Sequence, residues 1–138
     1  MRILNWEEYN SCIKSITFSC KGKEFSGVYG IPRGGLCLAV ALSHSLDIPL
    51  VTEITSGCLV VDDVYETGKT LSRILTIPNT TTFVWFSKVT PQWWNAVEIV
   101  SSDEWLIFPW ENKDRAEEDM KAYQLSRRKN KCLKKQFI

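Results

Sequence analysis

Residues 59–71 read LVVDDVYETGKTL, and this stretch decides the fold of the chain. An apolar run leads into two adjacent carboxylates, Asp62 and Asp63, and a short polar loop then opens a helical pattern. A run that is apolar on both faces is typical of an inner strand of a parallel sheet covered by helices. Ligands bind beyond the carboxyl ends of such strands. We therefore expect Asp62 and Asp63 to lie in a binding site.

The residue types after this strand predict the kind of ligand. Adjacent carboxylates repel each other unless a cation or a hydroxyl-rich group meets them. A vicinal diol such as ribose O2 and O3 satisfies that need, and so does hydrated Mg²⁺. Residues 66–70, ETGKT, present successive backbone N–H groups at a helix N-terminus, which suits a phosphate. The pattern therefore predicts a ribose 5-phosphate site.

A second glycine-rich segment, residues 30–36 with the sequence GIPRGGL, lies between an expected strand and an expected helix. Arg33 offers a planar fork for phosphate oxygens. Gly34 and Gly35 let the backbone approach a ligand closely. An ordinary Gly-Gly entry into a helix is the alternative interpretation of this segment.

Hydrophobic periodicity along the rest of the chain predicts strands and helices in alternation. Helices are expected at 5–20, 35–46, 70–77 and 112–131, and strands at 27–31, 48–54, 58–61, 81–86, 97–100 and 105–108. Such alternation predicts an α/β fold with a mostly parallel central sheet flanked by helices. With 138 residues and no internal repeat or linker, we expect one domain spanning residues 1–138.

Composition excludes several classes of protein. Apolar residues make up 44% and charged residues 24%, and no run of about 18 apolar residues suggests a membrane span. Residues 1–8 turn acidic where a signal peptide would be apolar, so we expect a cytoplasmic protein. Five widely spaced cysteines and one histidine do not make a zinc site. We expect reduced thiols that fill the core, with a nucleophilic cysteine paired with His44 as the alternative.

Charge is unevenly distributed although the net charge is only +1. Residues 121–138 hold seven lysines and arginines and no acidic residue. A basic helix and tail at about 112–138 could bind nucleic acid, and a solvated helix end is the plainer interpretation. The tail alone does not indicate a nucleic-acid binder, and we expect no such partner.

Residues 59–71 resemble the signature of the type I phosphoribosyltransferases, and residues 30–36 stand in the order and at the spacing of that family's pyrophosphate loop. In the family this loop commonly contains a non-proline cis peptide bond. The resemblance implies that 5-phosphoribosyl 1-pyrophosphate (PRPP) binds through its ribose and 5-phosphate at Asp62, Asp63, Glu66, Thr67, Gly68, Lys69 and Thr70, and through its pyrophosphate at Arg33, Gly34 and Gly35.

Two later segments resemble the bacterial xanthine-guanine phosphoribosyltransferases. Residues 86–88, FSK, end an expected strand, and residues 103–111 read DEWLIFPWE. The resemblance implies that Lys88 donates to the purine O6, that Trp105 stacks on the base, and that the backbone of Leu106 contacts its 2-position. A lysine suits a carbonyl acceptor, and stacking needs a broad aromatic face.

The implied reaction moves ribose 5-phosphate from PRPP to a 6-oxopurine (guanine, xanthine or hypoxanthine) and releases pyrophosphate. Asp62, Asp63 and Glu66 are the implied catalytic residues, with Mg²⁺ as cofactor near Asp62 and Asp63, partly through water. The resemblance also implies a homo-oligomer, either a dimer or a tetramer.

The chain departs from the family in three places. The connection between Asp47 and Cys58 is very short, which indicates a reduced version of the hood that closes over the reacting centre. Glu66 stands where the purine enzymes usually have Asp, and the basic C-terminal segment has no match. A non-catalytic PRPP- or nucleotide-binding regulator is therefore the alternative function, with transfer to another nitrogen nucleophile, such as a pyrimidine, as a third.

Overall fold

The computed structural model describes residues 1–136, with the side chains of residues 1–129. The chain forms two compact units, one of residues 6–104 and one that combines residues 1–5 with those from Trp105 onward. Each unit is described by itself below. A single domain spanning the whole chain stays a prediction.

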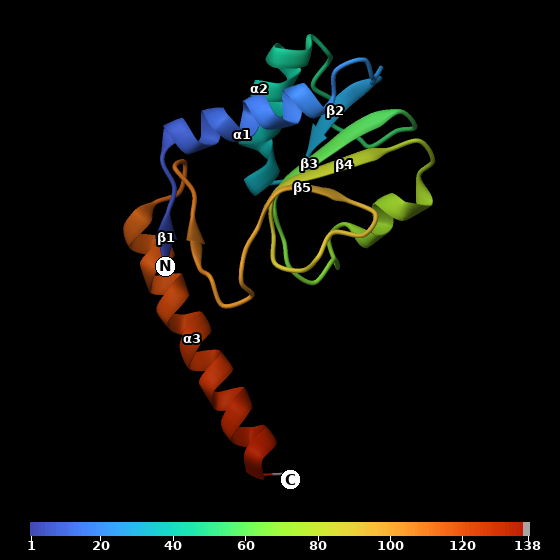
Figure 1. The fold of residues 1–138 in the computed structure, drawn as a ribbon. Helices are drawn as coiled ribbons and strands as arrows, with labels where there is room; N and C mark the ends of the chain where they lie inside the picture. The colour runs from blue at the N-terminus through green and yellow to red at the C-terminus, as the bar shows by residue number, and fades with distance from the viewer. Residues whose placement is uncertain (137–138) are drawn as a thin grey trace. The chain divides into compact units, whose positions relative to one another are not determined.

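The larger unit is an α/β structure around a four-stranded sheet (Figure 1). Its elements are α1 (Trp6–Ser19), β2 (Gly27–Gly30), α2 (Gly34–Leu46), β3 (Cys58–Tyr65), the 3-10 helix η1 (Ser72–Thr76), β4 (Thr81–Ser87) and β5 (Asn95–Ile99). The strands follow the order β2-β3-β4-β5, and every neighbouring pair is parallel. In Figure 1, α1 and α2 lie on one side of the sheet and η1 on the other. The predicted α/β fold with a parallel sheet is confirmed.

Strand β3 is an inner strand, as predicted, because its first residues are apolar on both faces and are buried from Cys58 through Val61. It continues four residues beyond the expected end at Val61. Backbone pairing with β4 persists as far as Tyr65, which lies opposite Ser87. The strand therefore carries the two acidic residues itself instead of releasing them into a loop.

A cluster of buried side chains fixes the segment that follows β3. This cluster, called the loop cluster below, consists of Ile31, Val60, Leu71, Ile74, Val84 and Trp94. Leu71 and Ile74 are each only 2% exposed, and they follow directly on the polar loop of residues 66–70. Their burial anchors the carboxyl end of that loop against the sheet.

Two of the predicted elements need correction. The strand predicted at 48–54 is wrong: in this segment only Leu50 forms a bridge, with Val28. Pro49 has no N–H to donate, and Leu50 is 47% exposed, so a regular ladder does not develop there. The helix predicted at 70–77 is shorter and is a 3-10 helix, η1.

The smaller unit contains β1 (Arg2–Ile3), β6 (Leu106–Ile107) and α3 (Lys113–Gln136). The two short strands pair in parallel, a contact that sequence periodicity did not predict for β1. Asn112 caps α3, because its Oδ1 accepts a hydrogen bond from the backbone N–H of Arg115 at 3.0 Å. None of the helices within residues 1–136 is long and apolar enough to cross a membrane.

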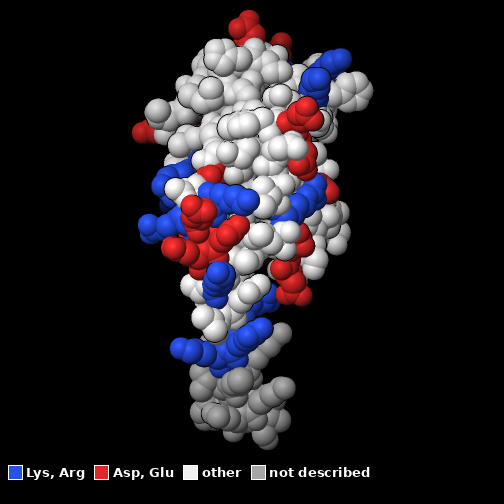
Figure 2. All heavy atoms as spheres, turned by 90° about the vertical axis from the view of Figure 1, so that its left-hand side faces the viewer, with Lys and Arg blue, Asp and Glu red and all other residues white. Residues whose placement is uncertain are grey.

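Most of α3 is polar. Ala116 is buried, whereas Tyr123 and Leu125 are 40% and 58% exposed. Figure 2 shows basic side chains and no acidic ones beside the grey C-terminal segment, where α3 carries residues 127–129. The basic character predicted for the end of this helix is therefore present on the surface of its described part.

Candidate active site

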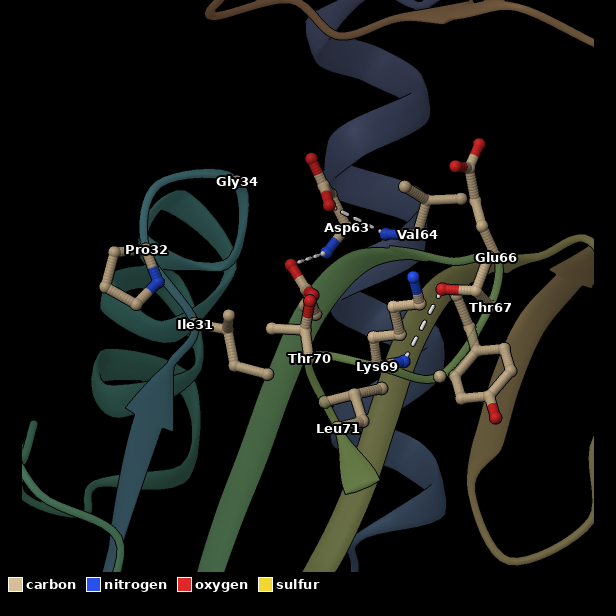
Figure 3. Close-up of a pocket in the computed structure, with 13 residues that line it drawn as sticks. Ile31, Pro32, Gly34, Asp63, Val64, Glu66, Thr67, Lys69, Thr70 and Leu71 are labelled. Carbon is tan, nitrogen blue, oxygen red and sulfur yellow. Dashed lines mark hydrogen bonds between the residues drawn. The ribbon is translucent and has the colours of Figure 1, made fainter. Parts of the chain in front are cut away.

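A pocket of about 290 Å³ opens where β2 and β3 end. Figure 3 shows how three segments face it: the loop after β2, the end of β3 and the polar loop that follows. Its lining consists of Ile31, Pro32, Gly34 and residues 62–71. The structure thus brings Asp62 and Asp63 together with the predicted phosphate loop and with Gly34. Arg33 and Gly35 are not among the lining residues, although they flank Gly34.

The two carboxylates are held by the backbone that follows them. Asp62 is only 9% exposed, and its Oδ1 accepts a hydrogen bond from the backbone N–H of Asp63 at 2.8 Å. Asp63 Oδ1 accepts one from the N–H of Val64, also at 2.8 Å. Each carboxylate therefore has a fixed orientation.

Two negative charges on this pair are unfavourable in its surroundings. Burial raises the pKa of Asp62 to about 8, and the charge of Asp63 adds to the shift. Burial also raises the pKa of Asp63, although its hydrogen bonds oppose the change. A cation, or a ligand that donates hydroxyl groups, would relieve this unfavourable arrangement.

The glycines of the segment after β2 are required by close packing. A Cβ at Gly34 would overlap the carboxylate of Asp63, and a Cβ at Gly35 would overlap the carbonyl oxygen of Val61. The peptide bond between Pro32 and Arg33 is cis, as the resemblance of residues 30–36 to a pyrophosphate loop predicts. The backbone of this segment therefore lies directly against the acidic pair, and the exposed side chain of Arg33 is carried at its edge.

The polar loop after β3 turns sharply at Gly68, whose φ of 78° lies in the left-handed region. The carbonyl of Gly68 accepts the N–H of Ser72 at 2.9 Å, which joins the loop to the first turn of η1. Thr67, Lys69 and Thr70 are exposed along the pocket. Backbone N–H groups and hydroxyls at the start of a helical turn form a cradle that suits a phosphate.

Lys88 and Glu66 meet beside this pocket. The ammonium of Lys88 lies 2.5 Å from Oε1 of Glu66, and the lysine side chain is only 8% exposed. Backbone pairing fixes the two residues next to each other, since the N–H of Lys88 donates to the carbonyl of Tyr65 at 2.9 Å. Two of the predicted base-binding and catalytic residues are therefore in direct contact.

Trp105 and Leu106 belong to the smaller unit. Leu106 is buried in β6, and the ring of Trp105 lies 5.3 Å from that of Tyr123. The indole N–H of Trp105 is buried and has no hydrogen-bond partner among the described residues. Contact of these two residues with a base stays a prediction.

Sequence periodicity did not predict an aromatic group beside the polar loop of residues 66–70. Tyr65 stacks on Trp94 with 3.6 Å between ring centroids, and Trp93 packs edge-on against both rings. The signal was present: Tyr65 stands inside the signature, and two consecutive tryptophans follow the next strand. Neither fact alone shows that the rings meet.

The thiols do not form a reactive site. Burial raises the pKa of Cys12 to about 12 and also raises the pKa of Cys20, Cys37 and Cys58. Such thiols are poor nucleophiles at neutral pH. This agrees with the expectation of core cysteines and gives no support to a pair with His44. The side chain of Cys132 lies outside the described residues.

Comparison with known proteins connects these observations to one family. No family model matches the chain. It is 24% identical to the xanthine-guanine phosphoribosyltransferase of Desulfotalea psychrophila, over 81% of this chain and 87% of that protein. It is 25% identical to that of Cereibacter sphaeroides, over 78% and 85%. The purine phosphoribosyltransferase structure from Pyrococcus horikoshii matches with a TM-score of 0.67 at 25% identity, over 80% of this chain and 93% of that one. In sequence and fold the chain is therefore similar to xanthine-guanine and purine phosphoribosyltransferases.

Proposed function

We propose that the protein transfers the 5-phosphoribosyl group of PRPP to a 6-oxopurine, giving a nucleoside monophosphate and pyrophosphate. The observation that carries this proposal is the meeting of the Asp62–Asp63 pair, the loop of residues 66–70 and Gly34 at one pocket. A diol site and a phosphate cradle side by side match the two ends of a ribose 5-phosphate. The relatives named for purine phosphoribosyltransferase activity support the same substrate class.

PRPP would use three parts of the site. Its ribose hydroxyls hydrogen-bond with Asp62 and Asp63, where burial makes two bare negative charges unfavourable. Its 5-phosphate is bound by the backbone and hydroxyls of Glu66, Thr67, Gly68, Lys69 and Thr70. The pyrophosphate lies along Arg33, Gly34 and Gly35, where the guanidinium pairs with phosphate oxygens.

The purine base would replace the ion pair between Lys88 and Glu66 and contact each of these side chains itself. The ammonium of Lys88 donates to the purine O6, and Glu66 accepts or relays the proton near N7. Trp105 is assigned to stacking and the backbone of Leu106 to the 2-position. A carbonyl at position 6 accepts from lysine, whereas the amino group of adenine does not.

The reaction forms one bond and breaks one. A ring nitrogen of the base attacks C1 of the ribose as the bond from C1 to the pyrophosphate oxygen breaks. The base loses a proton to Glu66 or to water, and pyrophosphate leaves with the bonding electrons. The protein contributes mainly by positioning the reactants and stabilising charge, and not through a covalent intermediate.

Mg²⁺ fits this donor set. Asp62 and Asp63 are hard oxygen ligands whose raised pKa values show that their ionised form lacks stabilisation, which a hydrated divalent cation would supply. No three His, Cys, Asp or Glu side chains within the described part of the chain converge as metal ligands. Asp62 and Asp63 would therefore hold the ion through water, with PRPP supplying further oxygens. When bound, Mg²⁺ would neutralise charge on the leaving pyrophosphate.

Calorimetric titration with PRPP in the presence of Mg²⁺ tests the first half of the proposal. We expect one site per chain and competition by pyrophosphate. Absence of binding would contradict the assignment of the pocket.

We further propose a cytoplasmic homo-oligomer, whose subunit number light scattering would measure.

A non-catalytic PRPP or nucleotide sensor is the second candidate function. One observation favours it: the connection between α2 and β3 contains no helix or strand and makes a single bridge, from Leu50 to Val28. This segment stands where the family has its hood. A sensor would bind PRPP without forming nucleotide, and a site without a hood would not exclude water from the reacting centre.

A further inference from the structure

Tyr65, Trp93 and Trp94 form a group of packed rings, called the aromatic clamp here. The rings of Tyr65 and Trp94 are nearly parallel, with an interplanar angle of 12° and centroids 3.6 Å apart. Trp93 meets Tyr65 at 79° and 6.4 Å, and meets Trp94 at 77° and 5.4 Å. The Tyr65 ring therefore contacts both indole rings, that of Trp94 face to face and that of Trp93 at a steep angle.

The clamp is fixed to the sheet and cannot easily move. Trp94 is only 4% exposed and belongs to the loop cluster. Its indole N–H donates to Oγ of Ser87 at 3.1 Å, and that hydroxyl donates to the carbonyl of Val89 at 2.6 Å. A ring stacked on such a fixed partner has little rotational freedom.

The Tyr65 side chain touches the phosphate loop at its sharpest turn. A Cβ at Gly68 would overlap the Tyr65 hydroxyl, so that hydroxyl packs directly against the backbone of Gly68. Gly68 holds the left-handed conformation on which the path of the loop depends. The aromatic clamp therefore supports the loop of residues 66–70 at Gly68, where the chain turns.

The main chain of Tyr65 contacts Lys88, the residue assigned to the base. Its carbonyl accepts the N–H of Lys88 at 2.9 Å, and the residue pairs with Ser87 in the parallel ladder. Tyr65 therefore touches the phosphate loop with its side chain and Lys88 with its backbone. Glu66, the first residue of that loop, also contacts Lys88, through its carboxylate.

We propose that Tyr65 is a positioning residue: stacked on Trp94 and packed under Gly68, it holds residues 66–70 in the conformation that receives the 5-phosphate. The proposal rests on the proposed function for its ligand, because that loop is assigned to PRPP. It goes beyond that function by giving a role to Tyr65, a residue outside the assigned binding set.

The variants Tyr65→Leu and Tyr65→Phe test the proposal. Tyr65→Leu removes the stack, and we expect the Kd for PRPP to rise about five- to tenfold. Amide hydrogen exchange at residues 66–70 should quicken while that of β2 stays unchanged. Tyr65→Phe keeps the ring, so both quantities should stay within about twofold of wild type. If Tyr65→Leu does not fold, Trp93→Leu removes the edge contact from a half-buried position and should give the same pattern at about twofold.

Ile16→Ala is the matched control, because Ile16 is fully buried in α1, outside both the loop cluster and the assigned binding set. At equal loss of thermal stability, Ile16→Ala should leave PRPP affinity and the exchange of residues 66–70 unchanged. Equal changes in Ile16→Ala and Tyr65→Leu would overturn the proposal, and so would unchanged exchange in Tyr65→Leu. Failure of the wild-type protein to bind PRPP would contradict the proposed function instead, and hydrogen exchange would still decide whether Tyr65 orders the loop.

Discussion

The ammonium of Lys88 lies 2.5 Å from the carboxylate of Glu66, at the point where β4 and β3 end side by side. Glu66 is 47% exposed, whereas Lys88 is 8% exposed, so the pair lies at an edge that a ligand can reach from the Glu66 side. Since Glu66 stands where the family usually has Asp, its additional methylene extends the reach of this carboxylate. A base that binds here must therefore accept a hydrogen bond from Lys88 and interact with Glu66 in place of their ion pair.

Replacing Lys88 tests the assignment of the base site. We expect Lys88→Ala to raise the KM for guanine at least about tenfold, because a charged hydrogen bond to O6 is lost, and to leave the Kd for PRPP within twofold. Selectivity for oxopurines over adenine should fall in steady-state assays with both bases. An equal loss for adenine and guanine would argue against contact with O6.

Replacing Asp63 tests the ribose site. Asp63→Asn keeps the size of the side chain and removes its charge, so we expect PRPP binding to be lost in calorimetry while the circular dichroism spectrum stays unchanged. Asp47→Asn is the matched control, because Asp47 is exposed at the end of α2 and its φ of 53° is one that Asn tolerates. Unchanged PRPP affinity in Asp63→Asn would refute the assignment.

The two adjacent glycines of the segment after β2 should respond differently to the same change. In Gly34→Ala the new Cβ meets a side-chain carboxylate that can turn away, so we expect a large loss of PRPP affinity and a small loss of stability. In Gly35→Ala it meets the backbone carbonyl of Val61, and we expect about 1–3 kcal/mol of destabilisation. Chemical denaturation and PRPP titration of both variants check this contrast, which equal stability losses would contradict.

The raised pKa of Asp62 predicts a dependence of stability on pH. In the folded protein Asp62 releases its proton at about pH 8, whereas in the unfolded chain it does so near 3.8. Between these values the folded state holds a proton that the unfolded state has lost, so the free energy of unfolding falls as pH rises from about 4 to 8. Above pH 8 we expect Asp62→Asn to melt about 3–5 °C higher than wild type, the shift for roughly 1 kcal/mol in a domain of this size.

The control for this experiment is the thermal midpoint below about pH 4, where Asp62 is largely protonated in the folded and unfolded states alike and the two proteins should differ little. Parallel pH profiles of wild type and Asp62→Asn would contradict the expectation. A more stable variant that has lost PRPP binding would show that the acidic pair is maintained for its ligand at a cost in stability.

The sequence predicted those parts of the fold that depend on local pattern. The apolar run before Asp62 identified the inner strand, and Gly34 and Gly35 identified a close backbone approach. The segment 48–54 also contains apolar and β-branched residues, but whether it pairs along its length depends on Pro49 and on the neighbouring strand β2, which composition does not reveal. The strand prediction failed there for that reason.

Contacts between distant segments were beyond prediction from the sequence alone. The Glu66–Lys88 pair exists because Tyr65 lies opposite Ser87, and a shift of one residue in that register would turn the side chains to other faces. The aromatic clamp depends on the same register. Gly34 could be named as a loop glycine, but only the structure shows that its missing Cβ makes room for Asp63.

The most direct test of the account is turnover of the purified chain with PRPP, Mg²⁺ and each of guanine, xanthine, hypoxanthine and adenine, with nucleotide and pyrophosphate measured together. The account predicts equal amounts of both products from one or more oxopurines and none from adenine. Tight PRPP binding without any nucleotide would contradict it and would favour a non-catalytic sensor.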